Sequence, residues 1–198
     1  MLSKSLKKSI YLIGPQSTGK TTLTQALQQY YGPETPVLEE IARSILNQKK
    51  YSADSLLSNQ CFQMQTDIFD AQFLEEKSFV DQGKFFISDR NAVDPIVYAK
   101  MYSGNPDDWK HFCKSPEWKI LRSRYKNQEN CLVVLMLPIT EFLVDDGTRL
   151  MPQDLEEWIE IGNQFQEFLK DQCIPFQVLG ENYSGIEERV KKVVFWTE

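Results

Sequence analysis

The stretch GPQSTGKTT, residues 14–22, follows the apolar run IYLI and precedes a segment with helical spacing of apolar residues. It matches the pattern G-x-x-x-x-G-K-[ST] in full, between an expected strand and an expected helix. That arrangement gathers backbone N–H groups around one concave space and adds the positive end of the helix dipole. The stretch therefore predicts a phosphate-binding loop at the start of an α/β fold.

Each residue type in this loop has a use in holding a nucleoside triphosphate. Gly14 and Gly19 let the backbone wrap the phosphates, Lys20 reaches the β- and γ-phosphates, and the Thr21 hydroxyl can bind Mg²⁺. The predicted nucleotide-binding residues are Gly14, Pro15, Gln16, Ser17, Thr18, Gly19, Lys20, Thr21 and Thr22. A glycine-rich turn with a solvated lysine is the alternative, and the flanking pattern argues against it. ATP or GTP, with Mg²⁺, are the expected cofactors.

The composition is that of an ordinary globular domain. Hydrophobic residues make up 41% and charged residues 25% of the 198 residues, which excludes a mainly disordered or fibrous chain. The net charge of −6 makes a long polynucleotide an unlikely partner, because domains that track nucleic acid usually carry a positive face. The expected partners are thus a nucleoside triphosphate and a small-molecule acceptor, and the sequence leaves the oligomeric state open.

The four cysteines and the chain start bear on the compartment. Cys61, Cys113, Cys131 and Cys173 lie far apart, and only one histidine, His111, could join them in a metal site. This spacing favours reduced thiols over disulfides or zinc. No run of 18 apolar residues exists, and the basic N-terminus leads directly into the strand before the loop. We therefore expect a cytoplasmic protein without a membrane span.

Strands and helices alternate along the chain, which is typical of a parallel sheet covered by helices. Strands are expected at 10–13, 37–40, 85–88, 131–137 and 174–179. Helices are expected at 23–30, from 41, and at 54–77, 95–101, 155–169 and 186–195. The prediction is one P-loop kinase-like domain over residues 1–198, a three-layer α/β P-loop NTPase fold with a five-stranded parallel sheet. Residues 103–118 are interpreted as an irregular insertion, a candidate flap over the site, and 139–151 as a short lid.

Charged residues follow the other expected strands, and the carboxyl ends of parallel strands meet at one edge of the sheet. Asp89 is placed to bind Mg²⁺ or to take a proton from the acceptor, and Arg90 to clamp an acceptor or a phosphate. A simple strand-end ion pair is the alternative for this pair. Glu40 and Arg43 are one helical turn apart and could equally form a surface pair.

Two further sets of residues are assigned roles from their place in the chain. Arg149 follows the fourth strand on a glycine-containing segment, where a mobile arginine can neutralise charge on a transferring phosphoryl group; a solvated loop arginine is the alternative. The aromatic residues are expected to belong mainly to the core, although a ring face could stack on a base. They are Tyr11, Phe62, Phe69, Phe73, Phe165 and Phe168.

Four segments make the chain resemble the P-loop group that includes NadR-type nicotinamide riboside kinases and the TRPL translocation defect protein. They are GPQSTGKTTL, EEIAR, LVDDGTR and LGENYSGIEERV, and they span nearly the whole chain in the family's order. The resemblance implies that Glu40 and Arg43 face the acceptor. It also implies that Asp146 and Arg149 belong to the lid, and that Tyr183 and Arg189 face the nucleotide or its base. The segment SDRNAVD departs from this pattern and looks more like the Asp-Arg of thymidylate and deoxynucleoside kinases.

Together these features predict a Mg²⁺-dependent kinase that transfers the γ-phosphoryl of ATP or GTP to a small nucleoside-like acceptor. Lys20, Glu40, Asp89 and Arg149 are the candidate catalytic residues, with Thr21 and Asp89 at the metal. Glu40, Arg43 and Arg90 are the candidate acceptor-binding residues. One alternative is a nucleotide-binding regulatory switch with slow hydrolysis, and a polynucleotide 5′-end kinase is a further alternative that the acidic charge disfavours.

Overall fold

The computed structural model describes residues 6–139, 155–183 and 185–198, and within them five parallel strands form one sheet. The strand order is β2-β3-β1-β4-β5, so that β1, which leads into the phosphate loop, is central. The strands are β1 (Ser9–Ile13), β2 (Val37–Leu38), β3 (Ile87–Asp89), β4 (Cys131–Met136) and β5 (Gln177–Leu179). The predicted five-stranded parallel sheet is confirmed.

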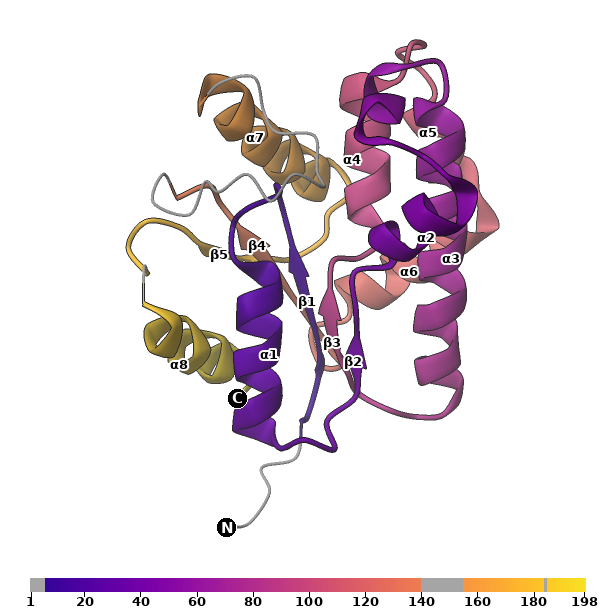
Figure 1. Cartoon of the computed structure of the whole chain (residues 1–198). Helices are drawn as coiled ribbons and strands as arrows, with labels where there is room; N and C mark the ends of the chain where they lie inside the picture. Colours follow the sequence, from indigo (N-terminus) through magenta and orange to yellow (C-terminus); the bar gives the residue numbers. More distant parts are fainter. Residues whose placement is uncertain (1–5, 140–154, 184) are drawn as a thin grey trace.

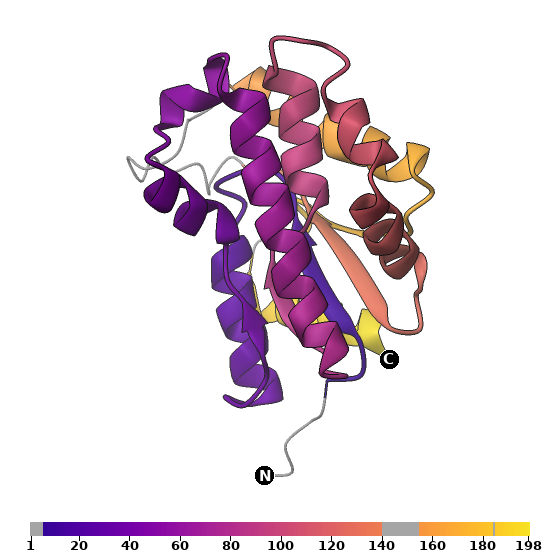
Figure 2. The same cartoon turned by 90° about the vertical axis from the view of Figure 1, so that its right-hand side faces the viewer.

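Helices connect the strands and cover both faces of the sheet (Figures 1 and 2). They are α1 (Lys20–Tyr31), α2 (Ile41–Lys49), α3 (Cys61–Asp81), α4 (Val93–Tyr102), α5 (Trp109–Lys114), α6 (Pro116–Lys126), α7 (Leu155–Asp171) and α8 (Ile186–Thr197). A short 3₁₀ helix, η1 (Ala53–Leu57), precedes α3. None of the helices in the described part of the chain is both long and apolar enough to cross a membrane.

The core consists of two main layers because alternate residues of a strand point to opposite faces of the sheet. Ile10 and Leu12 of β1 pack with α1 and α8, whereas Tyr11 and Ile13 pack with α3, α4, α6 and α7. The predicted core aromatics lie in or against this second layer. Every residue of β1 and of β4 is buried, as expected for interior strands covered on both faces.

The helix boundaries differ from expectation at two places. The helix expected at 54–77 is two elements, because Ser52 and Ser55 cap a separate 3₁₀ turn and the α-helix begins only at Cys61. The segment 103–118, expected to be irregular, contains α5 and the start of α6. Phe112 and Trp118 from this segment are buried in the core, so the segment is helical and packed rather than irregular. Ser115 accepts a hydrogen bond from the Trp118 N–H at 3.0 Å and thereby caps α6.

Candidate active site

The phosphate loop turns sharply between β1 and α1. Gly14, Ser17 and Gly19 all have positive φ angles, of 125°, 58° and 81°. A Cβ atom added to Gly14 would lie 2.5 Å from the backbone oxygen of Met136 on β4, so this position excludes any side chain. The second glycine is the residue directly before α1, in the left-handed conformation. The two glycines of the motif are therefore required by backbone conformation and by close packing.

Lys20 is folded into the loop rather than extended into solvent. Its Nζ donates to the Gly14 carbonyl oxygen at 2.9 Å and to the Thr18 hydroxyl at 3.2 Å, and it also donates to the Pro15 carbonyl oxygen. The side chain is only 4% exposed. Burial, together with repulsion from the Arg90 guanidinium, lowers the pKa of Lys20 to about 7. An anion bound in the loop would offer this ammonium group a better partner than the carbonyl oxygens.

The Thr21 hydroxyl and the Asp89 carboxylate meet at the first turn of α1. The Thr21 Oγ1 donates to Asp89 Oδ2 at 2.5 Å, across the contact between α1 and the end of β3. These are hard oxygen ligands, of the kind that Mg²⁺ prefers when it bridges protein and phosphate. The donor set thus fits the predicted cofactor, with Thr21 and Asp89 as the residues that would hold it.

Arg90 connects the phosphate loop to two carboxylates. Its Nε donates to Glu40 Oε1 at 2.7 Å, and its Nη1 donates to Asp94 Oδ1 at 2.6 Å and to the Gly14 carbonyl oxygen at 3.4 Å. Burial alone would lower the pKa of Arg90, but Glu40 and Asp94 outweigh it and raise that pKa well above its usual value. We call Glu40, Arg90 and Asp94 the acidic array. Within it, the guanidinium that was predicted to clamp a ligand is bound by protein carboxylates.

A strained backbone directs Arg90 into this position. Its φ angle is +85°, a conformation that few residues other than glycine adopt. The Arg90 N–H donates to the Leu12 carbonyl oxygen at 2.9 Å, and the Ser88 hydroxyl donates to the Arg90 carbonyl oxygen at 2.6 Å. These bonds hold the chain where β3 ends. The same turn leads into α4, which supplies Asp94.

Glu40 lies directly before α2 and accepts hydrogen bonds from two arginines. Besides Arg90, the Arg43 Nε donates to Glu40 Oε2 at 2.9 Å. The Arg43 side chain is 52% exposed, whereas those of Glu40 and Arg90 are 9% and 10% exposed. The i,i+3 pair predicted as one interpretation of EEIAR therefore exists, and its carboxylate also belongs to the buried array.

Arg189 and Tyr183 lie on the other side of the loop. Arg189 of α8 is buried and donates from Nη1 to the Thr18 carbonyl oxygen at 3.0 Å and from Nε to the Tyr183 carbonyl oxygen at 2.6 Å. The Lys192 ammonium lies over the Tyr183 ring, 5.7 Å from the ring centre. The Arg189 side chain thus contacts the backbone of the phosphate loop. Asp146 and Arg149, predicted for the lid, lie outside the described residues.

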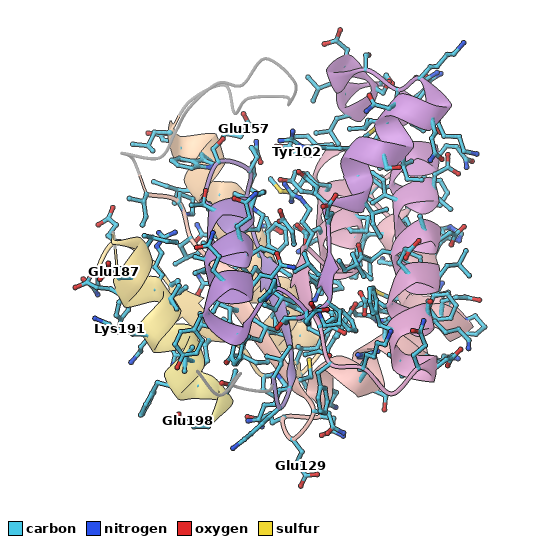
Figure 3. The ribbon with its side chains drawn as sticks, turned by 60° about the horizontal axis from the view of Figure 1, so that its bottom comes forward. Tyr102, Glu129, Glu157, Glu187, Lys191 and Glu198 are labelled. Atoms are coloured by element: carbon cyan, nitrogen blue, oxygen red, sulfur yellow. The ribbon has the colours of Figure 1, made fainter. Side chains whose placement is uncertain are left out.

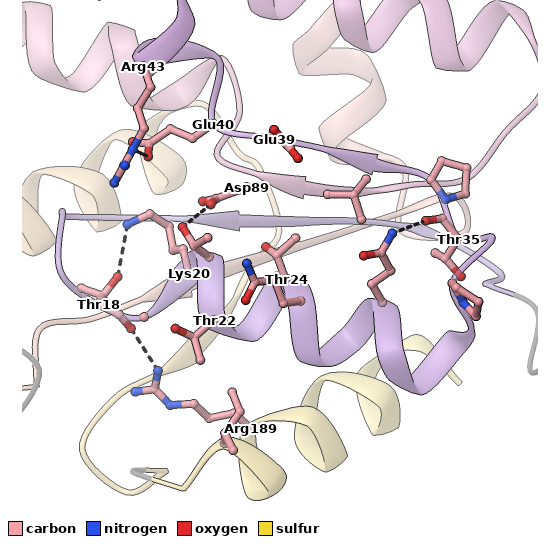
Figure 4. A pocket seen from close by; sticks show the side chains of 18 of the residues that line it. Thr18, Lys20, Thr22, Thr24, Thr35, Glu39, Glu40, Arg43, Asp89 and Arg189 are labelled. Atoms are coloured by element: carbon pink, nitrogen blue, oxygen red, sulfur yellow. Dashed lines mark hydrogen bonds and ion pairs between the residues drawn. The ribbon is translucent and has the colours of Figure 1, made fainter.

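A cleft of about 1340 Å³ joins these groups (Figure 4). It runs from the loop residues Ser17 to Thr22 along α1 toward the segment before β2. Glu39, Glu40, Arg43, Asp89 and Arg189 also line it. Figure 4 shows Lys20, Asp89 and Glu40 around one end of this space, with Arg189 on the opposite side of the loop. The phosphate loop after β1, Glu39 and Glu40 after β2, and Asp89 at the end of β3 therefore meet at one edge of the sheet, whereas Arg149 lies outside the described residues.

The sequence analysis missed three residues that contribute to the site. Asp94 is the buried partner of Arg90, and its i,i+4 spacing in DRNAVD was the available signal. Burial raises the pKa of Asp94, against the opposing effects of Arg90 and Lys20. Tyr98 of α4 and Trp158 of α7 donate hydrogen bonds to Gln16 in the loop, at 2.7 and 2.9 Å. No local pattern marks these two residues, because their partner is distant in sequence.

Solved structures of similar fold include NadR and two nucleoside or nucleotide kinases. NadR in complex with NR has a TM-score of 0.66 and 25% sequence identity; the match covers 97% of this chain and 52% of that chain. Thymidylate kinase from Candida albicans has a TM-score of 0.65 and 18% identity, and 95% of this chain and 89% of that chain are covered. Deoxyadenosine kinase from M. mycoides with bound dATP has a TM-score of 0.62 and 16% identity, with 95% and 97% covered. This chain thus spans about half the length of the NadR chain.

The comparisons with family models and with curated proteins give different results. No curated protein matches the sequence significantly. The family model AAA_28, described as an AAA domain, matches residues 9–189, which include the whole phosphate loop, the acidic array and Arg189. The resemblance to NadR and to nucleoside and nucleotide kinases is confirmed in fold. The chain is a P-loop protein that belongs to the AAA_28 family of AAA domains.

Proposed function

We propose that this chain transfers the γ-phosphoryl group of ATP or GTP to a small nucleoside-like acceptor in a Mg²⁺-dependent reaction. The observation that carries the proposal is the oriented Glu40 carboxylate, held by Arg90 and Arg43 in the same cleft as the phosphate loop. A carboxylate held beside a phosphate loop can accept the proton of a hydroxyl group that attacks the terminal phosphate. The likeness in fold to proteins named as kinases supports the same reaction class.

On the nucleotide side, the loop residues bind and orient the phosphates. The backbone N–H groups of the loop and the start of α1 hold the triphosphate, and Lys20 leaves its carbonyl partners to neutralise the terminal phosphates. Thr21 and Asp89 would hold Mg²⁺, which would offset phosphate charge. Arg149 is proposed to add positive charge at the transferring group, and Tyr183 and Arg189 to lie on the nucleotide side.

On the acceptor side, Glu40 positions the hydroxyl that attacks. The acceptor oxygen forms a bond to the γ-phosphorus, the bond from that phosphorus to the β–γ bridging oxygen breaks, and the nucleoside diphosphate leaves. The hydroxyl proton passes to the Glu40 carboxylate. Arg90 is assigned a positioning role toward Glu40, and the half-exposed Arg43 faces the acceptor. Orientation is the main contribution expected here, because phosphoryl transfer needs little covalent help from protein groups.

The test is a turnover assay with ATP or GTP and a panel of nucleosides, nicotinamide riboside and nucleoside monophosphates. With the acceptor that works, Glu40→Gln is expected to lower kcat by about 10²-fold and to leave the ATP dissociation constant within a fewfold. Glu39→Gln is the matched control, since Glu39 is the adjacent, exposed glutamate of the same cleft. It is expected to keep most of the activity.

Three results would contradict the proposal. Full turnover by Glu40→Gln would remove Glu40 from the acceptor side. A wild-type protein that phosphorylates nothing on the panel, yet binds ATP or GTP much more tightly than the diphosphate, would favour a regulatory switch. Phosphorylation of an oligonucleotide 5′ end, but of no small acceptor, would favour the polynucleotide kinase.

A further inference from the structure

The carbonyl groups of the phosphate loop are bound by side chains from distant elements. Arg90 donates to the Gly14 oxygen, Trp158 donates to the Gln16 oxygen, and Arg189 donates to the Thr18 oxygen. In a short loop, carbonyl groups that turn outward leave N–H groups free to turn inward. Donors outside the loop therefore help to fix its anion-binding shape.

Gln16 at the outer turn of the loop is held twice. The Trp158 Nε1 donates to its backbone oxygen at 2.9 Å, and the Tyr98 hydroxyl donates to its side-chain Oε1 at 2.7 Å. Trp158 is completely buried and Gln16 is 7% exposed, so water competes little for these bonds. The adjacent Ser17 has the strained φ angle of 58°, which the loop must maintain.

The two donors belong to helices that are themselves tied together. Tyr98 lies on α4 and Trp158 in the first turns of α7, and these helices pack against each other. The Tyr102 hydroxyl of α4 donates to Glu157 Oε1 of α7 at 2.9 Å, and Figure 3 shows these two residues close together. The Tyr98 ring also packs edge-on against Phe165 of α7, with ring centres 6.1 Å apart. The support under Gln16 is thus a packed helix pair.

We infer that Trp158, together with Tyr98, is a positioning residue that sets the shape of the phosphate loop through Gln16. Neither side chain is assigned a contact with the nucleotide. Their effect is on the affinity of the loop for a polyphosphate. The inference rests on the proposed binding of nucleotide phosphates to this loop, and it is independent of whether the phosphoryl group is later transferred.

The experiment compares Trp158→Phe with Trp118→Phe. Trp118 is a matched control, because it is equally buried and its Nε1 also donates one hydrogen bond, to Gln172 Oε1 at 3.2 Å, in a different part of the core. Dissociation constants are measured by calorimetry for Mg²⁺·ATP and for inorganic tripolyphosphate, which can use only the loop. Thermal unfolding of both variants gives the structural cost.

Trp158→Phe is expected to weaken the binding of both ligands by about fivefold, the usual effect of one hydrogen bond. Trp118→Phe is expected to leave both affinities within twofold. It should lower the unfolding temperature by about as much as Trp158→Phe does. Tyr98→Phe should weaken both ligands by a smaller factor. Equal weakening of ATP and tripolyphosphate separates an effect on the loop from an effect on the base or ribose.

Unchanged tripolyphosphate affinity in a folded Trp158→Phe variant would overturn the inference, as would equal weakening by Trp118→Phe. If Trp158→Phe does not fold, Tyr98→Phe decides: weakened tripolyphosphate binding supports the inference, and wild-type affinity overturns it. A wild-type protein that binds tripolyphosphate but phosphorylates no acceptor would contradict the proposed function and leave this inference standing. One that binds neither ligand would overturn both.

Discussion

The phosphate loop and the acidic array face each other at the same end of the sheet, but the chain builds them in different ways. The loop is nine consecutive residues, 14–22, whose identities fix its turns and its helix start. The array joins Glu40 after β2, Arg90 after β3 and Asp94 in α4, which only the fold brings together. The loop is thus formed locally and supported from outside, whereas the array adds a distant residue, Glu40, to the local i,i+4 pair of Arg90 and Asp94.

The two regions are therefore sensitive to different kinds of substitution. A local loop depends on backbone conformation, so the wrong residue at one glycine damages it directly. A buried array depends on charge balance, because removing its cation leaves desolvated carboxylates with less opposing charge. We expect four substitutions or pH changes to reveal this contrast.

Removing the central cation should have the largest effect. Arg90→Leu leaves the buried carboxylates of Glu40 and Asp94 without their shared guanidinium. The expected loss is about 3–5 kcal/mol in the free energy of unfolding, measured by urea denaturation. The loss should be smaller at acidic pH, since protonation of the carboxyl groups removes the negative charges that Arg90 balanced. A variant as stable as the wild type would show that the array does not depend on charge balance.

Gly14→Ala should cost about 3 kcal/mol, because the new methyl group meets the Met136 oxygen and the backbone has a φ angle of 125°. Gly83→Ala is the matched control: Gly83 also has a positive φ angle, of 66°, but no atom lies within 4 Å of the added Cβ. It should cost about 1 kcal/mol. Chemical denaturation measures both, and equal losses would show that strain rather than close packing restricts Gly14.

Nucleotide affinity should fall as the pH rises above 7. The pKa of Lys20 is lowered to about 7 in the free protein, mainly by burial, and bound phosphates would raise it again. The complex then takes up a proton between these two pKa values, so affinity decreases with pH, by at most about tenfold per pH unit. Calorimetry of Mg²⁺·ATP binding between pH 7 and 9, in buffers of different ionisation enthalpy, measures the uptake.

Lys20→Arg is the control for this proton uptake, because a guanidinium group stays protonated over that range. Its ATP binding, where measurable, should show no net uptake. Equal uptake by both proteins would assign the proton to another group.

The smallest effect is expected at the exposed member of the same cluster. Arg43→Leu removes a second partner of Glu40, but the side chain is 52% exposed and Arg90 remains bound to the carboxylate. The free energy of unfolding should change by less than about 1 kcal/mol. A loss as large as that of Arg90→Leu would remove the distinction between the buried array and its exposed rim.

Much of the architecture could be predicted because the patterns are local. The apolar runs at 10–13 and 131–137 indicated buried strands, and the alternation with helices indicated a parallel sheet. The helix boundary near Ser52 and the helices in 103–126 were harder to predict, because both regions contain turn-forming residues. In the second region, only the burial of Phe112 and Trp118 distinguishes packed helices from an irregular loop. Burial of those two side chains is a tertiary fact that turn composition does not reveal.

By itself, the sequence determined the phosphate loop, its glycines and the acidic residues at the strand ends, since spacing and residue type follow from backbone geometry. Only the tertiary structure shows that Arg90 binds Glu40 and that Trp158 and Tyr98 hold Gln16, because these contacts join elements far apart in the chain. The contacts of Arg90 with Asp94 and of Lys20 with the Gly14 oxygen join residues close in the chain, but burial and charge select them only once the core has packed.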